Sequence, residues 1–290
     1  MIKVTALLFI FTNMLLFQNC NLKSTTADKN PINSDLTPDS ILNYKRLLWI
    51  GAHPDDEIPL SPLLKEFCKK QDKSCMLLTL TLGENGRCKL SLGCLPDLAF
   101  KRTNEFINSG KYLNADVFQF DFGDSLKPTI NGIFNEWTNK MANISSLEDL
   151  LINKITEFKP DIIFTFDPRH GTTCHPAHRA AGELVISASK KALFPRESLY
   201  MIESIITGVG GSSNVGFRSA VLEDKNVQEI SYKQDWTAPV NLMRYVYKSQ
   251  YFESESILLS QIPIESQIIS LLPFVNAQDN DYRYFNLCTN

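Results

Sequence analysis

Two polar clusters, each placed after an apolar run, organise this sequence. The run over residues 46–50 stops at Gly51, and a histidine and three consecutive carboxylates follow within residues 53–57. A second apolar run, residues 161–166, precedes the segment His175-Pro176-Ala177-His178. An apolar run that gives way to polar residues predicts a buried strand ending in a loop, and ligands bind at such strand ends in an open α/β sheet. Because the two clusters lie far apart in the chain, only the fold can bring them together.

The chain from residue 46 onward alternates apolar runs with amphipathic segments, which predicts βα units and a mainly parallel sheet. Further strands are expected at residues 75–80, 117–120, 161–166 and 199–206, and helices at residues 58–70, 96–114 and 178–193. With 290 residues, the chain is long enough for one large α/β domain with a substantial core. We therefore expect a Rossmann-like open, mainly parallel sheet with helices on both faces, over residues 44–290.

The pairing of Ala52-His53-Pro54-Asp55-Asp56-Glu57 with the later His175-Pro176-Ala177-His178 resembles the zinc-dependent N-deacetylases of the PIG-L (LmbE-like) family. The segments between the two motifs, residues 81–86, 101–105 and 165–168, follow in the family's order. The resemblance covers roughly residues 46–251. It implies a metal-dependent hydrolase that acts on an acetylated amine.

Adjacent carboxylates beside an imidazole repel one another unless a positive charge lies among them, and a divalent cation is the simplest candidate. A catalytic zinc site takes three nitrogen or oxygen ligands and keeps one position open for water. His53 and Asp56 can face one point from the start of a helical turn, and His178 can complete the set; Fe²⁺ suits the same ligands. The resemblance implies the same three ligands, with Asp55 as the general base and His175 as the electrophilic partner of the carbonyl.

Other residues in the matching region are candidates for substrate contact. By the resemblance, Asp124 lies where family members have a carboxylate that binds sugar hydroxyls, and a turn-forming aspartate is the alternative. Arg87 and Thr173 are the remaining candidates, and Thr173 stands where some relatives have a tyrosine that assists the oxyanion. Ala177 replaces an aspartate often found between the last two histidines, so His175 lacks the charged partner that usually orients it.

Three further features concern residues that could support the site. We expect Glu57 to cap the following helix rather than to bind metal. Arg102 and Glu105 are three residues apart and can pair on a helix, either bracing the site or forming a solvated ion pair. The segment Tyr247-Lys248-Ser249-Gln250 resembles a family segment that tends to have histidine in place of the tyrosine.

The amino terminus is expected to be an export signal rather than part of the fold. Lys3 is followed by an apolar segment, residues 4–17, that is too short for a comfortable membrane span. We therefore predict that residues 1–20 are a signal peptide with a loose bacterial lipobox. Cys20 would then become the lipidated first residue of the mature protein. The alternatives are ordinary secretion and an uncleaved anchor. Residues 21–43 have few large apolar side chains and are expected to form a disordered tether. This predicts an exported, membrane-anchored lipoprotein in the periplasm or on the cell surface.

The cysteines fit an exported protein. There are seven, and setting Cys20 aside as the lipidated one leaves six. In an oxidising compartment this number predicts disulfides. Short intervening loops favour the pairs Cys88–Cys94 and Cys68–Cys75.

The function expected from these features is zinc-dependent removal of the acetyl group from an N-acetylated sugar, of N-acetylglucosamine type, on a glycan or glycolipid. One alternative is a surface lipoprotein that binds glycans without catalysis, and another is a metallo-amidohydrolase acting on a non-sugar amide. A net charge of -3 with scattered basic residues argues against a nucleic-acid partner. The membrane enters as a partner only through the lipid anchor.

Overall fold

The computed structural model describes residues 41–141, 145–168, 171–195, 198–204, 230–233, 237–260 and 268–273. The expected signal peptide, Cys20 and the expected tether up to residue 40 lie outside the described residues. Ile41 is fully buried in the hydrophobic core. The folded part therefore already includes residue 41, within the stretch that we expected to be tether.

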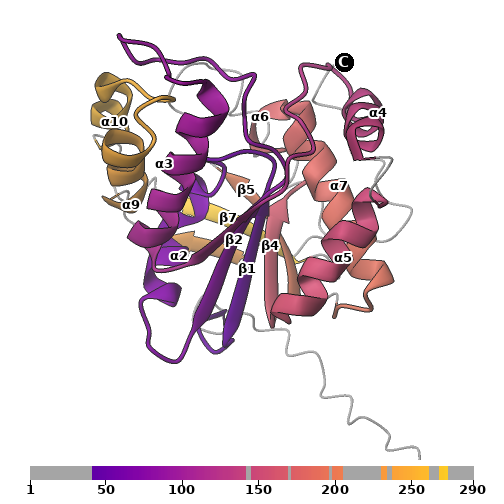
Figure 1. The fold of residues 1–290 in the computed structure, drawn as a ribbon. Helices are drawn as coiled ribbons and strands as arrows, with labels where there is room; N and C mark the ends of the chain where they lie inside the picture. The colour runs from indigo at the N-terminus through magenta and orange to yellow at the C-terminus, as the bar shows by residue number, and fades with distance from the viewer. Residues whose placement is uncertain are drawn as a thin grey trace, which may run out of the picture. The chain divides into compact units, whose positions relative to one another are not determined.

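Five parallel strands form the centre of one open sheet, in the order β3-β2-β1-β4-β5, and two antiparallel strands, β7 and β6, extend it beyond β5 (Figure 1). This confirms the expected α/β fold with a mainly parallel sheet. The strands are β1 (Arg46–Gly51), β2 (Ser74–Thr79), β3 (Asp116–Gln119), β4 (Ile162–Phe166), β5 (Leu199–Ser204), β6 (Ile230–Lys233) and β7 (Ile268–Pro273).

Helices cover both faces of the sheet, as expected (Figure 1). One face carries α2 (Ser61–Cys68), α3 (Leu98–Leu113), α9 (Thr237–Asn241), the π-helical turn η3 (Leu242–Val246) and α10 (Glu253–Ser260). The other face carries α4 (Ile130–Met141), α5 (Leu147–Phe158) and α7 (Pro176–Lys191). Two short helices, η1 (Ile58–Leu60) and α6 (Gly171–Cys174), follow the ends of β1 and β4.

The central strand β1 shows why the sheet is covered on both sides. Its side chains alternate between two separate cores: Leu47 and Trp49 pack with the helices α2 and α3, whereas Leu48 and Ile50 pack with α5 and α7. All four are fully buried. A parallel strand that is buried on both faces has a continuous apolar sequence, which is the run that the sequence shows.

Helix α3 carries several residues of the site, and its ends are defined locally. The Asp97 side chain accepts a hydrogen bond from the backbone N–H of Phe100 at 2.8 Å, which caps the start of the helix. At the other end Asn114 adopts a left-handed conformation, with φ at 60°, which ends the helix. Because α3 runs back from the carboxyl edge of the sheet, its first turns lie next to the loops that follow β1 and β2.

Close packing of α3 on β3 leads to a stability prediction. A Cβ added at Gly110 would lie 2.4 Å from Val117 Cγ1 and 2.8 Å from the Ala115 carbonyl oxygen. Because backbone cannot move aside cheaply, Gly110→Ala is expected to lower the free energy of unfolding by about 1–3 kcal/mol. Urea denaturation followed by circular dichroism measures the change. Asn108→Ala, on an exposed position of the same helix, is the control; equal midpoints for the two variants would contradict the prediction.

Both disulfides predicted from short loops are present. Cys68–Cys75 joins the end of α2 to β2, and Cys88–Cys94 closes a loop ahead of α3. Cys174 is also disulfide-bonded, so it offers no free thiolate to a metal.

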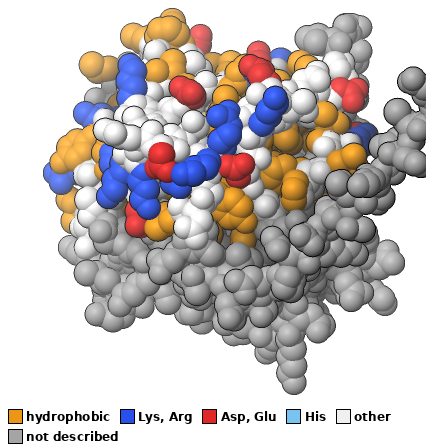
Figure 2. Space-filling model, turned by 90° about the horizontal axis from the view of Figure 1, so that it is seen from below, with side chains coloured by type: hydrophobic (Ala, Val, Ile, Leu, Met, Phe, Trp, Pro, Cys, Tyr) orange, Lys and Arg blue, Asp and Glu red, His pale blue; other side chains and the backbone are white. Residues whose placement is uncertain are grey.

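Figure 2 shows the face of the molecule opposite to the carboxyl edge of the sheet. Lys and Arg side chains on this face lie among Asp, Glu and apolar side chains, so charges of both signs are mixed there. Lys45 and Asp72, which precede β1 and β2 in the sequence, form an exposed ion pair. Within the part of the chain that the structure describes, no helix combines the length and apolar content that crossing a bilayer requires.

Candidate active site

The loop after β1 is organised by the Asp56 carboxylate. Its Oδ2 accepts hydrogen bonds from the backbone N–H groups of Ala52 and His53, both at 2.7 Å. A Cβ on Gly51 would lie 2.8 Å from Asp56 Cβ, so a glycine is needed for the carboxylate to fold back over the strand end. The buried Asp56 thereby has a fixed position and still presents its second oxygen, Oδ1.

The second motif supplies His178 in the first turn of α7. Its Nδ1 lies 2.9 Å from the Gly171 carbonyl oxygen, and its ring stacks on Phe166 of β4 with centroids 4.3 Å apart. Because a carbonyl only accepts hydrogen bonds, Nδ1 carries the proton and Nε2 is left as the free nitrogen. That Nε2 lies 3.0 Å from Asp56 Oδ1.

The fold brings the two motifs together at the carboxyl edge of β1 and β4. The ring centroids of His53 and His178 are 5.3 Å apart, and His175 lies 5.1 Å from the first and 4.7 Å from the second. One nitrogen from each of the three histidines falls within 4.8 Å of the others. His53 Nδ1 lies 3.6 Å from Asp56 Oδ2. Two loops that are distant in sequence thus form one cluster of three imidazoles and a carboxylate.

The donor set fits a divalent cation. Nε2 of His178 and Oδ1 of Asp56, which lie 3.0 Å apart, are both atoms that can bind a divalent cation. Nitrogen and carboxylate oxygen donors of this kind suit Zn²⁺ and also Fe²⁺. Two ligand sets are available: His53, Asp56 and His178, or the three histidines.

Asp55 takes no part in the imidazole cluster and is held by Arg102 of α3. Its φ of 93° is in the left-handed region, which is uncommon for residues other than glycine, although aspartate enters it more often than most. Arg102 Nη2 donates to Asp55 Oδ1 at 2.8 Å, and the same guanidinium donates to the carbonyl oxygens of Pro54 and, at 3.0 Å, Gly83. The expected pairing of Arg102 with Glu105 is therefore replaced by a pairing with the candidate base, which favours the bracing role.

The charges of the cluster shift its acid–base behaviour. Burial lowers the pKa of His53, but the carboxylates of Asp56 and Asp124 outweigh it and raise that pKa to about 10. Burial also opposes ionisation of Asp56, yet His178 and His53 hold the pKa of its carboxyl well below the usual range. For His175, burial and the two neighbouring imidazoles lower the pKa to about 4. His175 is thus a neutral imidazole at pH 7.

Of the three candidates for substrate contact, Asp124, Arg87 and Thr173, only Asp124 is described next to the imidazole cluster. Asp124 Oδ1 lies 3.2 Å from His53 Nε2, and its backbone N–H donates to Glu84 Oε1 at 2.9 Å, so Asp124 borders the cluster and Glu84 supports it. Arg87 is exposed, and no hydrogen bond or ion pair among the described residues joins it to the cluster. The side chain of Thr173 lies outside the described residues.

The expected role of Glu57 as a helix cap is wrong. Glu57 precedes η1, but its side chain makes no cap hydrogen bond. It is fully buried and accepts hydrogen bonds from Ser109 and, at 2.5 Å, from the Tyr247 hydroxyl. The local sequence could not reveal this, because both donors come from elements remote in the chain.

The comparisons with known proteins point to one family. The PIG-L family model, described as GlcNAc-PI de-N-acetylase, matches residues 48–189. The "Probable N-acetyl-alpha-D-glucosaminyl L-malate deacetylase 2" of Bacillus subtilis (strain 168) is 31% identical over 189 residues, which are 64% of this chain and 78% of that protein. The "1D-myo-inositol 2-acetamido-2-deoxy-alpha-D-glucopyranoside deacetylase 1" of Frankia casuarinae is 25% identical over 53% of this chain and 54% of its own length.

Two solved structures share the fold. The N,N'-diacetylchitobiose deacetylase from Pyrococcus horikoshii superposes with a TM-score of 0.56 at 16% identity, over 83% of this chain and 88% of that one. The A40926 pseudoaglycone deacetylase Dbv21 superposes with a TM-score of 0.51 at 14% identity, over 79% of this chain and 96% of that one. At these identities the likeness concerns the fold alone.

Proposed function

Since the chain belongs to the PIG-L family of N-deacetylases, which are hydrolases of non-peptide C–N bonds, we propose that it removes the acetyl group from an N-acetylglucosamine-type sugar of a glycan or glycolipid. The observation that carries the proposal is the meeting of His53, Asp56 and His178 beside Asp55 at the carboxyl edge of the sheet. His53, Asp56 and His178 would hold the metal ion. Zn²⁺ is the first candidate and Fe²⁺ the second.

The chain's own groups can carry out the acid–base steps of amide hydrolysis. A bound zinc ion supplies Lewis acidity and brings the pKa of a coordinated water to about 7. Asp55 accepts a proton from the attacking water while the new C–O bond forms at the acetyl carbon. The neutral His175 donates a hydrogen bond to the carbonyl oxygen as negative charge develops there. The C–N bond then breaks, and the amine leaves with the proton that Asp55 returns.

The substrate class is supported by the names of the relatives. The B. subtilis and Frankia proteins are each named for an acetylated glucosamine unit that carries a further group, and the archaeal deacetylase for a diacetylated chitobiose. Asp124, which borders the cluster, is the first candidate to bind the sugar hydroxyls, with Arg87 and Thr173 as further candidates. The shared unit of these substrates is an acetamido sugar, and we assign the same unit here.

We also propose that the protein is exported and anchored through lipid on Cys20. The disulfides Cys68–Cys75 and Cys88–Cys94 support export, because such bonds persist in oxidising compartments. Labelling of cells with a radioactive fatty acid, compared between the full chain and Cys20→Ser, tests the anchor. Equal label on both proteins would contradict it.

Acetate release tests the reaction. The zinc-loaded protein is expected to release acetate from N,N'-diacetylchitobiose and related acetamido sugars, and Asp55→Ala is expected to release none above background. Binding of the sugar without acetate release by either protein would instead show a glycan-binding module. Release from an N-acetylated amino acid but from no sugar in the panel would show an amidohydrolase of another substrate class.

A further inference from the structure

Helix α3 presents a stripe of buried polar side chains to the site. Arg102, Glu105 and Ser109 are spaced so that they lie on one face of the helix, and each is at most 5% exposed. Two of them contact the loop after β1 directly: Arg102 donates to Asp55 and Ser109 to Glu57. The helix therefore holds both ends of the turn that contains the candidate base and the candidate ligand Asp56.

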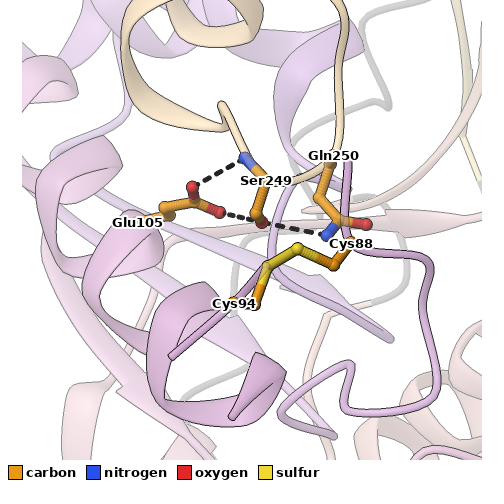
Figure 3. The surroundings of a disulfide bond; sticks show 5 residues. All are labelled: Cys88, Cys94, Glu105, Ser249 and Gln250. Atoms are coloured by element: carbon orange, nitrogen blue, oxygen red, sulfur yellow. Dashed lines mark hydrogen bonds between the residues drawn. A yellow bond between two sulfur atoms is a disulfide. The ribbon is translucent and has the colours of Figure 1, made fainter. Parts of the chain in front are cut away.

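A second segment, residues 247–250, contacts the same buried carboxylates. The Tyr247 hydroxyl donates to Glu57 Oε1 at 2.5 Å. The backbone N–H and the hydroxyl of Ser249 donate to Glu105 Oε1 and Oε2 at 2.9 and 2.5 Å. Figure 3 shows this second contact, with Gln250 donating in turn to the Ser249 hydroxyl at 3.0 Å.

The segment is itself fastened in place. The Cys88–Cys94 disulfide lies beside the Glu105–Ser249 contact (Figure 3), and the backbone N–H of Lys89 in that loop donates to the Ser249 carbonyl oxygen at 2.8 Å. Tyr247 and Ser249 are both fully buried. Residues 247–250 are thus bound by the helix, by the disulfide loop and by the loop of the site.

We propose that Tyr247 and Ser249 are positioning residues of the deacetylase site, an inference that rests on the proposed function. Tyr247 acts through Glu57, which adjoins Asp56, and Ser249 acts through Glu105, which lies one helical turn from Arg102. Together they keep Asp55 and Asp56 in the orientation that the reaction needs.

Two features of the turn at residues 54–57 explain why the contacts of Tyr247 and Ser249 affect the site. Asp55 has a positive φ of 93°, which is uncommon outside glycine, so the contacts around the turn help to hold this backbone in place. Glu57 accepts hydrogen bonds from the side chains of Ser109 and Tyr247 on Oε1, and its buried Oε2 has no partner among the described residues. Removing the Tyr247 hydroxyl leaves Ser109 as the only described side chain that donates to this buried carboxyl group, which disfavours the present position of the loop.

Tyr247→Phe tests the inference, with Tyr245→Phe as the matched control because Tyr245 is 60% exposed. For the full chain assayed at saturating zinc, kcat for acetate release is expected to fall about 10- to 100-fold in Tyr247→Phe, with KM unchanged within about twofold. Hydrogen–deuterium exchange of the peptide spanning residues 52–60 is expected to be faster in Tyr247→Phe than in the wild type and the control. A loss that came only from unfolding would lower zinc content and melting temperature together.

Ser249→Ala repeats the test through the carboxylate of Glu105, with Ser260→Ala, at an exposed position, as its control. If Tyr247→Phe does not fold, Ser249→Ala is the test. The inference would be overturned if Tyr247→Phe had the kcat and the exchange rates of the wild type. The same result in Ser249→Ala would overturn it if Tyr247→Phe does not fold. Either result would leave the proposed function intact. If the wild-type protein releases acetate from no substrate, the proposed function fails. The exchange rates of residues 52–60 then decide the positioning role by themselves.

Discussion

Replacing Asp55 by asparagine is expected to lower kcat for acetate release by about 100- to 10,000-fold, because the amide cannot accept the proton of the attacking water. The side chain keeps its size and can still accept a hydrogen bond from Arg102, so the turn at residues 54–57 should persist. Zinc content is expected to equal that of the wild type, because Asp55 belongs to neither of the two ligand sets and its Oδ1 is paired with Arg102. Steady-state kinetics and metal analysis of the same preparation measure both quantities.

The control for this variant is Asp121→Asn. Asp121 lies on the same edge of the sheet, is 54% exposed and, among the described residues, forms its ion pair with Lys140. It should retain wild-type kinetics. If Asp55→Asn kept more than about a tenth of the wild-type kcat, Asp55 would not be the general base, since general-base catalysis contributes at least about 100-fold.

His178→Ala is expected to remove the metal. The Nε2 atom of His178 faces Asp56 Oδ1, and its loss leaves too few ligands for the three-ligand site that catalytic zinc uses. We expect bound zinc to fall to about a tenth of the wild-type content or less at micromolar free zinc, and activity to fall with it. Equilibrium dialysis with metal analysis gives the content, and circular dichroism verifies that the variant is folded.

His175→Ala distinguishes the two ligand sets that the geometry allows. If His53, Asp56 and His178 hold the ion, His175→Ala keeps its zinc and loses about 100- to 1,000-fold in kcat through the missing oxyanion donor. Zinc loss in His175→Ala together with zinc retention in Asp56→Asn would assign the ion to the three histidines instead. Normal zinc content in His178→Ala would contradict both sets.

Several features of the fold could be predicted because their causes are local. The continuous apolar runs ending at Gly51 and Phe166 predict strands buried on both faces, and the polar residues after them mark the edge of the sheet at which ligands bind. Close spacing was also enough to predict both of the described disulfide pairs, since a thiol meets a near neighbour most readily. Helix ends and the start of the folded domain depend on packing as well as on local sequence, and Ile41 is part of the core.

The contacts that tune the site could not be predicted in the same way. Glu57 looked like a helix cap because it precedes a helix, yet it is buried against Ser109 and Tyr247. Arg102 and Glu105 have the spacing of a helical ion pair, yet Arg102 holds Asp55 and Glu105 holds Ser249. In each case the side chain binds a partner that only packing brings close, and the interaction predicted from the local sequence does not form. A buried charge is stabilised by whichever donor the fold places beside it.

The sequence by itself determined where the five parallel strands lie along the chain, the two polar motifs and the residue types able to bind a cation, since these depend on apolar periodicity and on chemistry carried within a few residues. Only the tertiary structure decided that His53 and His178 lie 5.3 Å apart between ring centroids, that Asp55 is held by α3, and that residues 247–250 support the loop of the site. The physical reason is that these contacts join segments that are far apart in the sequence, and separation in sequence does not determine distance in space. The parallel sheet sets that distance, because it aligns the carboxyl ends of its strands at one edge.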